Sequence, residues 1–204
     1  MTASSTTVVA AMRLEAMALG GRVVRTGMGH RRAQHAAAAL AARLAPGAPV
    51  VLAGISGGLA SHLVPGDVIV ATEVHDPEGG TRALDHGDAQ AVAAALGARG
   101  RRVHLGPVVS STTLVHGERR AELARSGALA VDMESAWVAD ALRAQRLVIV
   151  RVVADTAGSV AVGLFKGLGA LRGLRPAFDG WSAGAGGGTS GAADPGPDAP
   201  LRSS

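Results

Sequence analysis

The feature that most constrains the fold of this chain is the alternation of short, almost purely apolar runs with longer helix-like stretches. The clearest run is Leu147–Val153, which carries a single charged residue. Strands that are buried on both faces read in this way, and they require helices on both sides of the sheet. The alternation therefore predicts an α/β fold with parallel strand pairs. The predicted strands are Thr6–Met12, Arg22–Arg25, Val50–Ile55, Val68–Val74, Val103–Val109, Leu129–Val131 and Leu147–Val153.

Helices are predicted between these runs, with Asp88 as the N-cap of one of them. A glycine-interrupted apolar helix pattern follows from Gly158 to Phe178. Beyond Ala183 the chain is rich in Gly, Ala, Ser and Pro. We therefore expect one domain over residues 1–182 and a disordered tail over 183–204. The helices expected before Gly158 are His30–Leu44, Asp88–Ala98, Glu118–Ser126 and Met133–Ala144.

Composition excludes several classes of protein. A chain of 204 residues suits one domain with a sizeable core. No uncharged apolar run is long enough to span a bilayer, and the polar start Met1–Ser5 does not resemble a signal peptide. We expect a cytoplasmic protein without stable membrane insertion. The chain has no cysteine and no close histidine pair, so neither a thiolate site nor a metal is predicted.

The positive charge is not of the kind that nucleic-acid binding requires. The net charge is +4, and Lys166 is the single lysine, so the cations are almost all arginines. These arginines are scattered along the chain, and only 2% of the residues are aromatic. Single-strand binders combine a basic groove with aromatic platforms. We therefore expect no nucleic-acid partner.

Acidic side chains gather where a ligand would bind. Arg151 and Asp155 stand near the carboxyl end of a predicted strand, and ligands of open α/β sheets bind at such ends. Glu134 opens a predicted helix, where negative charge is favoured. We expect two acids and an arginine to converge on one crevice.

Two glycine loops follow predicted strands, at Thr26–His30 and Gly54–Gly58. A single loop of this kind is typical of a tight turn. Two such loops after neighbouring strands favour a ligand pocket and a pair of simple turns about equally. Neither loop has the third glycine of a dinucleotide fingerprint, which argues against an oxidoreductase. Ser56, Ser110 and Ser135 lack the GxSxG elbow of a serine hydrolase.

Taken in order, the motifs of the chain resemble the nucleoside phosphorylase/nucleosidase superfamily. The resemblance spans Val8 to Asp155, and Glu15 makes it similar to the methylthioadenosine/adenosylhomocysteine nucleosidase branch. The short chain and its Arg175–Trp181 end look most like hopanoid-associated nucleosidases. The residues that carry the resemblance are Ala11-Met12-x-x-Glu15, Gly27-Met28-Gly29, Gly54-x-x-Gly57-Gly58-Leu59, Pro65-Gly66-Asp67-Val68, Val131-Asp132-Met133-Glu134-Ser135 and Arg151-x-x-x-Asp155.

The resemblance implies a single-domain, three-layer α/β/α fold with a mixed central sheet, and cleavage of a purine N-ribosidic bond. Asp155 would protonate the leaving adenine, and Glu15 would be the general base on water held with the help of Arg151. Glu134 would bind the ribose hydroxyls, with the other substrate-binding positions around it. Those other positions are Met133 under the sugar, Leu114 and Val115 beside the base, and Ile55, Ser56 and Gly57 in the second glycine loop.

The chain departs from the family pattern at Ile55, at Leu114 and in two segments. Ile55 stands where relatives often carry a hydroxyl for water or phosphate, which favours hydrolysis over phosphorolysis. Leu114 stands where relatives often stack an aromatic ring on the base. The strand hairpin before Gly27 is also shorter than in relatives, and the segment after Asp155 is glycine-rich and apolar. These two changes suit a large apolar 5′ group such as a hopane skeleton. That segment is equally explained as core, which would bury Leu164, Phe165, Leu168 and Leu171.

The leading hypothesis is therefore hydrolysis of a 5′-substituted adenosine, for example adenosylhopane, by a homodimer that needs no cofactor. Two alternatives remain open. One is phosphorolysis of the same bond, and the other is a non-catalytic nucleoside-binding module.

Overall fold

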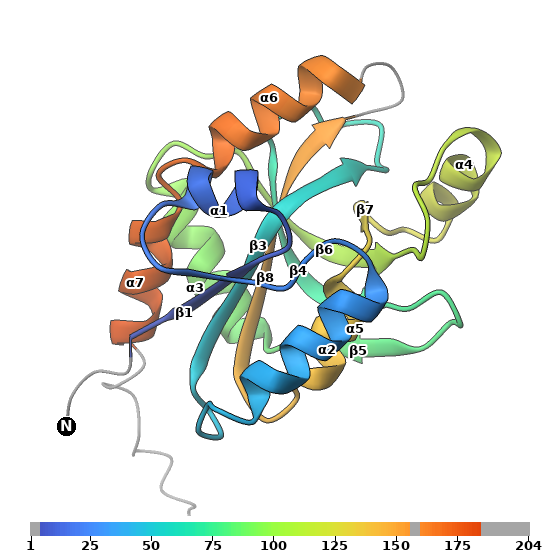
Figure 1. Cartoon of the computed structure of the whole chain (residues 1–204). Coiled ribbons are helices and arrows are strands. Elements are labelled where there is room, and N and C mark those ends of the chain that lie inside the picture. Colours follow the sequence, from blue (N-terminus) through green and yellow to red (C-terminus); the bar gives the residue numbers. More distant parts are fainter. Residues whose placement is uncertain (1–4, 156–159, 185–204) are drawn as a thin grey trace, which may run out of the picture.

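The computed structural model of the chain describes residues 5–155 and 160–184. Its centre is an eight-stranded mixed sheet with helices on both faces, which confirms the predicted α/β class (Figure 1). The strands are β1 (Thr7–Ala10), β2 (Val23–Arg25), β3 (Pro49–Gly58), β4 (Val68–His75), β5 (Thr81–Ala83), β6 (Val103–Ser110), β7 (Ala130–Asp132) and β8 (Arg146–Asp155). The helices are α1 (Arg13–Leu19), α2 (His30–Ala41), α3 (His86–Gly97), α4 (Gly117–Arg125), α5 (Ser135–Ala141), α6 (Val160–Leu171) and α7 (Arg175–Gly184).

The strand pairing closes on itself at the centre of the sheet. β3 pairs with β8, β8 with β4, β4 with β6, β6 with β7, and β7 returns to β3. β1 and β2 extend the sheet from β3, and β5 extends it from β4. Because β3 and β8 are parallel, their carboxyl ends lie side by side. The second glycine loop and Asp155 therefore reach the same edge of the sheet.

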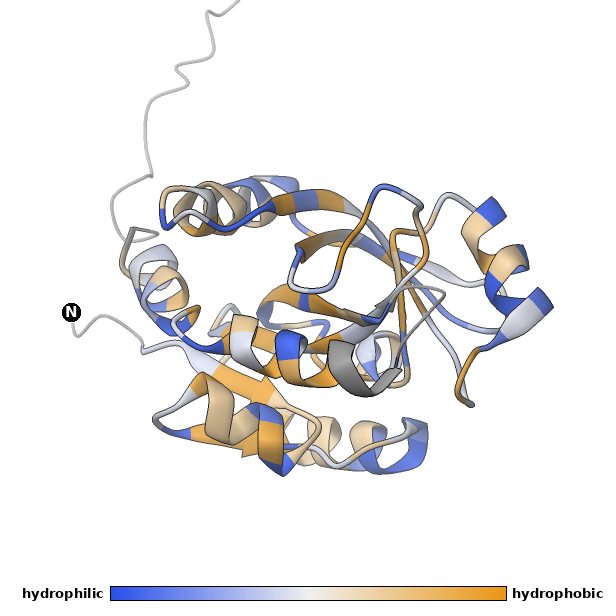
Figure 2. Ribbon diagram, turned by 90° about the horizontal axis from the view of Figure 1, so that it is seen from above, coloured by the Kyte–Doolittle hydropathy of each residue, from blue (hydrophilic) through white to orange (hydrophobic). Residues whose placement is uncertain are grey.

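Two large apolar cores fill the space between the sheet and its helices, and a smaller one joins β6 and β7 to α4. One core joins the sheet to α1, α3, α6 and α7, and Phe178 and Leu171 are fully buried in it. The other joins the sheet to α2 and α5 through small residues such as Ala37 and Val138. In Figure 2 the apolar colour is concentrated in the central strands, as expected for strands covered on both faces.

The predicted N-cap at Asp88 is wrong. Helix α3 begins at His86, and the N-cap is Asp85, whose Oδ1 accepts a hydrogen bond from the Asp88 amide at 2.7 Å. Asp88 lies inside the first turn and faces inward, where its carboxylate accepts from Arg146 Nε at 2.7 Å and from Trp181 Nε1 at 3.0 Å. Sequence pattern alone did not separate two acids three residues apart, because both stand where a helix N-terminus favours negative charge.

The C-terminal helix pattern divides into two helices. Gly173, at φ +79°, separates α6 from α7, and a left-handed residue of this kind ends a helix. Helix α7 continues to Gly184, just past the predicted domain boundary at residue 182. Residues 185–204 lie outside the described chain, so the predicted tail is untested. The short edge strand β5 was not predicted, since three residues carry no usable periodicity.

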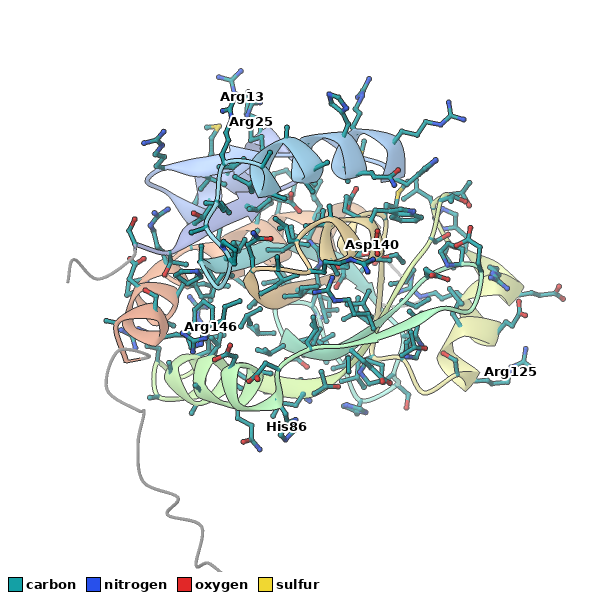
Figure 3. The ribbon with its side chains drawn as sticks, turned by 90° about the horizontal axis from the view of Figure 1, so that it is seen from below. Arg13, Arg25, His86, Arg125, Asp140 and Arg146 are labelled. Carbon is teal, nitrogen blue, oxygen red and sulfur yellow. The ribbon has the colours of Figure 1, made fainter. Side chains whose placement is uncertain are left out.

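The charged side chains are spread over the surface. In Figure 3, Arg13 and Arg25 project from one side of the molecule and Arg125 from another, in keeping with the scattered arginines of the sequence. Within residues 5–155 and 160–184, no helix has the length and apolar character needed to cross a membrane.

Candidate active site

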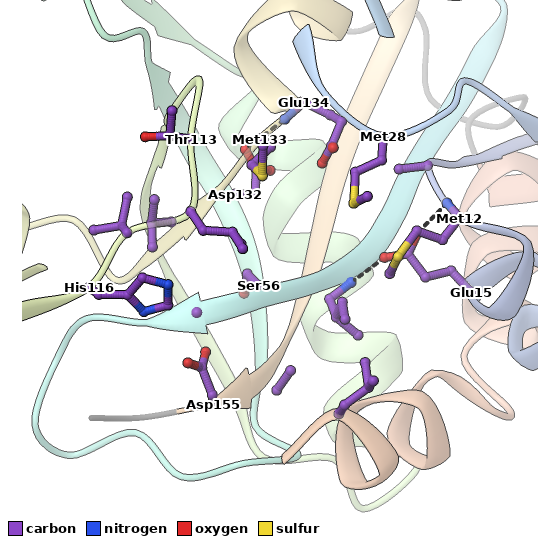
Figure 4. Close-up of a pocket in the computed structure, with 18 of the residues that line it drawn as sticks. Met12, Glu15, Met28, Ser56, Thr113, His116, Asp132, Met133, Glu134 and Asp155 are labelled. Carbon is purple, nitrogen blue, oxygen red and sulfur yellow. Dashed lines mark hydrogen bonds between the residues drawn. The ribbon is translucent and has the colours of Figure 1, made fainter. Parts of the chain in front are cut away.

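A cavity of about 280 Å³ opens where β3, β7 and β8 end. Its walls come from the start of α1, the glycine loop before α2, the segment before α4 and the side of α6 (Figure 4). The volume lies near the lower end of small-molecule sites. All predicted site residues except Arg151 line it, namely Glu15, Ile55, Ser56, Gly57, Leu114, Val115, Met133, Glu134 and Asp155.

Glu15 is held at one side of the cavity by two backbone amides. It lies in the first turn of α1, where its Oε2 accepts from the Met12 amide at 2.8 Å in a capping-box arrangement. Its Oε1 accepts from the Ile55 amide at 2.8 Å. Only 2% of Glu15 is exposed, and burial raises the pKa of its carboxyl, although these amides and the Arg151 charge oppose the rise. Glu15 is thus a fixed, partly desolvated carboxylate rather than a solvated helix acid.

Glu134 joins the first glycine loop to the cavity. Its Oε1 accepts from the Gly29 amide at 2.9 Å, and Gly29 adopts a φ of +89°, which favours glycine. The loop is therefore both a tight turn and part of the site. Burial and the neighbouring charge of Asp132 raise the pKa of the Glu134 carboxyl, against the opposing charge of Arg151.

Arg151 lies behind the cavity wall instead of in the expected crevice. Its side chain is fully buried, and its Nε is 2.7 Å from Asp132 Oδ2. Its Nη2 donates to Ser135 Oγ at 2.9 Å. Asp132 also accepts from the Ser110 hydroxyl at 2.6 Å and from the amides of Glu134 and Ser135. The Asp132-x-x-Ser135 spacing is therefore the means by which this motif holds a buried guanidinium.

Gly54 explains how Arg151 comes close to Glu15. A Cβ at this position would stand 2.5 Å from Arg151 Nη1 and 2.6 Å from Glu15 Oε1. Because that space must stay empty of a side chain, glycine is required for the close approach of the two groups. Arg151 Nη1 is buried without a hydrogen-bond partner within the described residues, so its charge faces the Glu15 carboxylate.

Asp155 ends β8 on the opposite side of the cavity from Glu15 (Figure 4). Its Oδ2 accepts from Arg120 Nη1 at 3.0 Å. Sequence reasoning missed Arg120, because this contact depends on where α4 lies relative to the end of β8. No motif around Gly117–Arg125 indicates that position. The other lining residues to which no role was assigned are Ala11, Met12, Met28, Thr113, His116, Val131, Asp132, Ala154 and Leu164.

The C-terminal apolar pattern serves both of the purposes considered for it. Leu171 is buried in the core and Leu168 packs against it. Leu164 lines the cavity, whereas Phe165 is 78% exposed. The second glycine loop also differs from a simple strand exit, because the Ser56 hydroxyl is buried at the cavity without a hydrogen-bond partner among the described residues.

The fold and site together define an α/β protein with a small-molecule pocket lined by carboxylates from separate chain segments. Within the described residues, no group of three or more His, Cys, Asp or Glu side chains is arranged to hold a metal ion. The chain belongs to the phosphorylase superfamily, whose family model matches residues 20–166, more than half of the chain.

Solved structures extend the likeness beyond the matched residues. A 5′-methylthioadenosine/S-adenosylhomocysteine nucleosidase from Neisseria meningitidis is 20% identical, with a TM-score of 0.72 over 89% of this chain and 99% of that one. A methylthioadenosine-bound D198N mutant of the Helicobacter pylori nucleosidase is 16% identical, with a TM-score of 0.73 over 86% and 97%. Futalosine hydrolase from the same organism is 17% identical, with a TM-score of 0.73 over 87% and 98%. A search of curated protein sequences gives no match. At these identities the structural likeness establishes the fold.

Replacing Asp132 by Asn should destabilise the protein by about 3–5 kcal/mol, because Arg151 would remain buried without its counter-charge. Urea unfolding measures this loss. The matched control is Asp140→Asn, since the Asp140 side chain is 63% exposed in its pair with Arg143 and should be near neutral. Equal stability of the two variants would show that the buried pair contributes little.

Replacing Ser56 by Ala should separate a ligand-binding role from a structural one. The hydroxyl has no partner to lose, so stability should be unchanged or rise by about 1 kcal/mol. Substrate affinity should fall by roughly threefold to tenfold if the hydroxyl bonds to the ligand. Exposed Ser61→Ala is the control, and thermal unfolding with ligand titration gives both quantities. An unchanged affinity would remove Ser56 from the binding site.

Proposed function

We propose that the protein hydrolyses the N-ribosidic bond of a 5′-substituted adenosine and releases adenine. The observation that carries the proposal is the placement of Glu15, Glu134 and Asp155 on separate sides of one cavity (Figure 4). Cleavage of this bond needs an acid at the base, negative charge at the sugar and a base for water. Three separated carboxylates suit these three tasks. The superfamily match and the nucleosidase folds of the neighbours support the same activity.

The leaving base would lie between Asp155 and the segment before α4. Protonated Asp155 donates its proton to N7 of adenine, and the electron pair of the C1′–N9 bond passes to the base. Val115 is 8% exposed and offers main-chain groups to the base edge, while the 74% exposed Leu114 covers the base from outside.

The ribose would lie over Met133, with its hydroxyls on Glu134. Ionised Glu134 accepts hydrogen bonds from the hydroxyls and faces the positive charge that develops on the ring. The Gly29 amide fixes one of its oxygens, so the carboxylate is oriented before the substrate arrives.

Water would be activated at Glu15. The ionised carboxylate takes one proton from water as the oxygen bonds to C1′, which completes the hydrolysis. Arg151 does not line the cavity, so its proposed contribution is to position Glu15 and to stabilise its negative charge across Gly54.

An apolar 5′ substituent suits the Glu15 side of the cavity. Met12 and Met28 lie beside Glu15 in Figure 4, and Leu164 of α6 adds a third apolar side chain. Met28, which lines the cavity, is 57% exposed, and Phe165, which follows the lining residue Leu164 in α6, is 78% exposed. An exposed apolar surface next to a pocket is typical of a binding site. We therefore keep a lipid-like group such as hopane as the proposed 5′ substituent.

Phosphorolysis is the second candidate, and the unpartnered Ser56 hydroxyl is the observation that favours it. A hydroxyl in the second glycine loop is able to donate to a phosphate oxygen. Against this, the adjacent Ile55 carries no hydroxyl, and its amide is already bonded to Glu15.

Product analysis tests the proposed function directly. Adenosylhopane, methylthioadenosine, adenosylhomocysteine and futalosine are incubated with the protein, with and without phosphate. We expect free adenine from an adenosine derivative without phosphate, and a lower rate with isosteric Asp155→Asn. Turnover that requires phosphate would establish phosphorolysis. Release of no base under any condition, together with tight nucleoside binding, would favour a non-catalytic binding module.

Replacing Glu15 by Gln should lower turnover by roughly 100-fold or more while leaving substrate affinity nearly unchanged, because the base acts on water. In the wild type, kcat/KM should fall on the acid side at a pH above 4.5, the ordinary pKa of Glu. Burial raises the pKa of Glu15 and Glu134, so both take up a proton at higher pH, and the reaction needs both ionised. Glu122→Gln, at a 58% exposed side chain, is the control. Near-normal activity in Glu15→Gln would remove Glu15 from the mechanism.

A further inference from the structure

Arg120 lines the cavity and makes three hydrogen bonds there, but the proposed mechanism gives it no role. It belongs to α4, yet its guanidinium reaches the ends of β3 and β8. Nη1 donates to Asp155 Oδ2 at 3.0 Å, and Nη2 donates to the Asp155 carbonyl at 3.0 Å and to the Gly58 carbonyl at 2.6 Å. One side chain therefore fixes both the main chain and the carboxylate of Asp155.

We propose that Arg120 is the positioning residue for Asp155, holding Oδ2 so that Oδ1 is presented to the leaving base. This inference rests on the proposed function and names a residue outside the motifs that carry the resemblance. Arg120 acts through Asp155, which is the residue that touches the substrate.

The end of the sheet is where such a support is needed. The parallel ladder between β3 and β8 shifts register between Ser56 and Gly57, so that Gly57 stands opposite Asp155. β8 ends at Asp155, and a strand end has little backbone pairing to define its direction. The three hydrogen bonds from Arg120, which lies on α4 outside the sheet, fix the direction of the chain at this strand end.

The two carboxylate oxygens of Asp155 have different surroundings. Oδ2 is bonded to Arg120, whereas Oδ1 accepts no hydrogen bond from any residue in the described chain. A Cβ added at Gly57 would lie 3.1 Å from Oδ1 and 3.4 Å from Arg120 Nη2. The absence of a side chain at Gly57 therefore keeps the space beside Oδ1 open to the cavity that both residues line.

The charge of Arg120 suits the product of proton transfer. When Asp155 Oδ1 gives its proton to purine N7, the C1′–N9 electron pair passes to the base and Asp155 is left as a carboxylate. That carboxylate already faces a guanidinium, in a pair whose side chains are only 13% and 18% exposed. A charge pair shielded from water in this way interacts more strongly than one on the surface.

The test compares two leaving groups in Arg120→Met. Purine nucleosides need a proton on the base, whereas p-nitrophenyl β-ribofuranoside carries a leaving group that departs without one. We expect adenine release to fall by roughly 10- to 100-fold, a part of the contribution of a general acid, and p-nitrophenol release to change by less than about threefold. Arg120→Lys, which keeps the charge but not the fork of donors, should recover part of the adenine release.

Arg119→Met is the matched control, since Arg119 is the adjacent helix residue and pairs with Glu122 at an exposed site. Melting temperatures check that each variant is folded. An Arg120→Met variant that cleaves purine nucleosides like the wild type would overturn the proposal. So would an equal loss with both leaving groups, because this would indicate general disruption of the site.

A double-mutant comparison tests the same proposal if p-nitrophenyl riboside is turned over too slowly to measure, or if Arg120→Met does not fold. Arg120→Lys is then combined with Asp155→Asn. If Arg120 acts through Asp155, the double variant should release adenine at the rate of Asp155→Asn alone. Additive losses would contradict the proposal. A wild type that releases no base from any nucleoside would instead reject the proposed function itself.

Discussion

The buried ion pair between Arg151 and Asp132 is the interaction on which the site depends. A guanidinium with no exposed surface is tolerated only where acceptors surround it, and Asp132 and Ser135 supply them from the turn before α5. That turn also carries Met133 and Glu134 into the cavity. The requirement to neutralise one arginine in the centre of β8 thus fixes the backbone that presents Glu134, the proposed ribose-binding acid.

The same arginine connects residues that are distant in sequence. Through the gap left by Gly54, its charge faces Glu15 on α1, which is in turn bonded to the amide of Ile55. The parallel pairing of β3 and β8 makes this contact possible, because it places Gly54 directly opposite Arg151. Glu15 and Glu134 therefore both experience the charge of Arg151, although they arise from α1 and from the turn before α5.

Much of this arrangement is predictable from sequence because it depends on local pattern. The long apolar run of β8 predicts a strand that is buried on both faces. Asp155 follows at the carboxyl end of this strand, and ligands of α/β sheets bind at such ends. The order of the superfamily motifs then brings Glu15, Glu134 and Asp155 to a common cavity. Helix ends are less well determined by sequence. At the start of α3 the N-cap is Asp85 and not the predicted Asp88, because either acid would be favoured near a helix N-terminus.

Contacts that depend on how elements pack are not predictable from one sequence. In the sequence, Arg120 looks like an ordinary arginine on a helix surface. Its contact with Asp155 arises only because α4 lies against the end of β8. Arg151 shows the opposite case, since its place in the motif suggests contact with the reacting water, while burial turns it to Asp132. Neither side chain carries a local signal for the direction in which it points.

The cluster of Asp88, Arg146 and Trp181 has a consequence for how the site is assembled. Arg146 is the first residue of β8, its guanidinium lies 4.4 Å from the centre of the Trp181 ring, and both residues bond to Asp88. The two ends of one strand are thus secured by different partners, with α3 and α7 at the start and α4 at the finish. Helix α7 lies beyond the region matched by the family model, which ends at residue 166. A helix beyond the residues matched by the family model therefore helps to set the alignment of the strand that carries the proposed acid, and changes in α7 would act on the position of that strand.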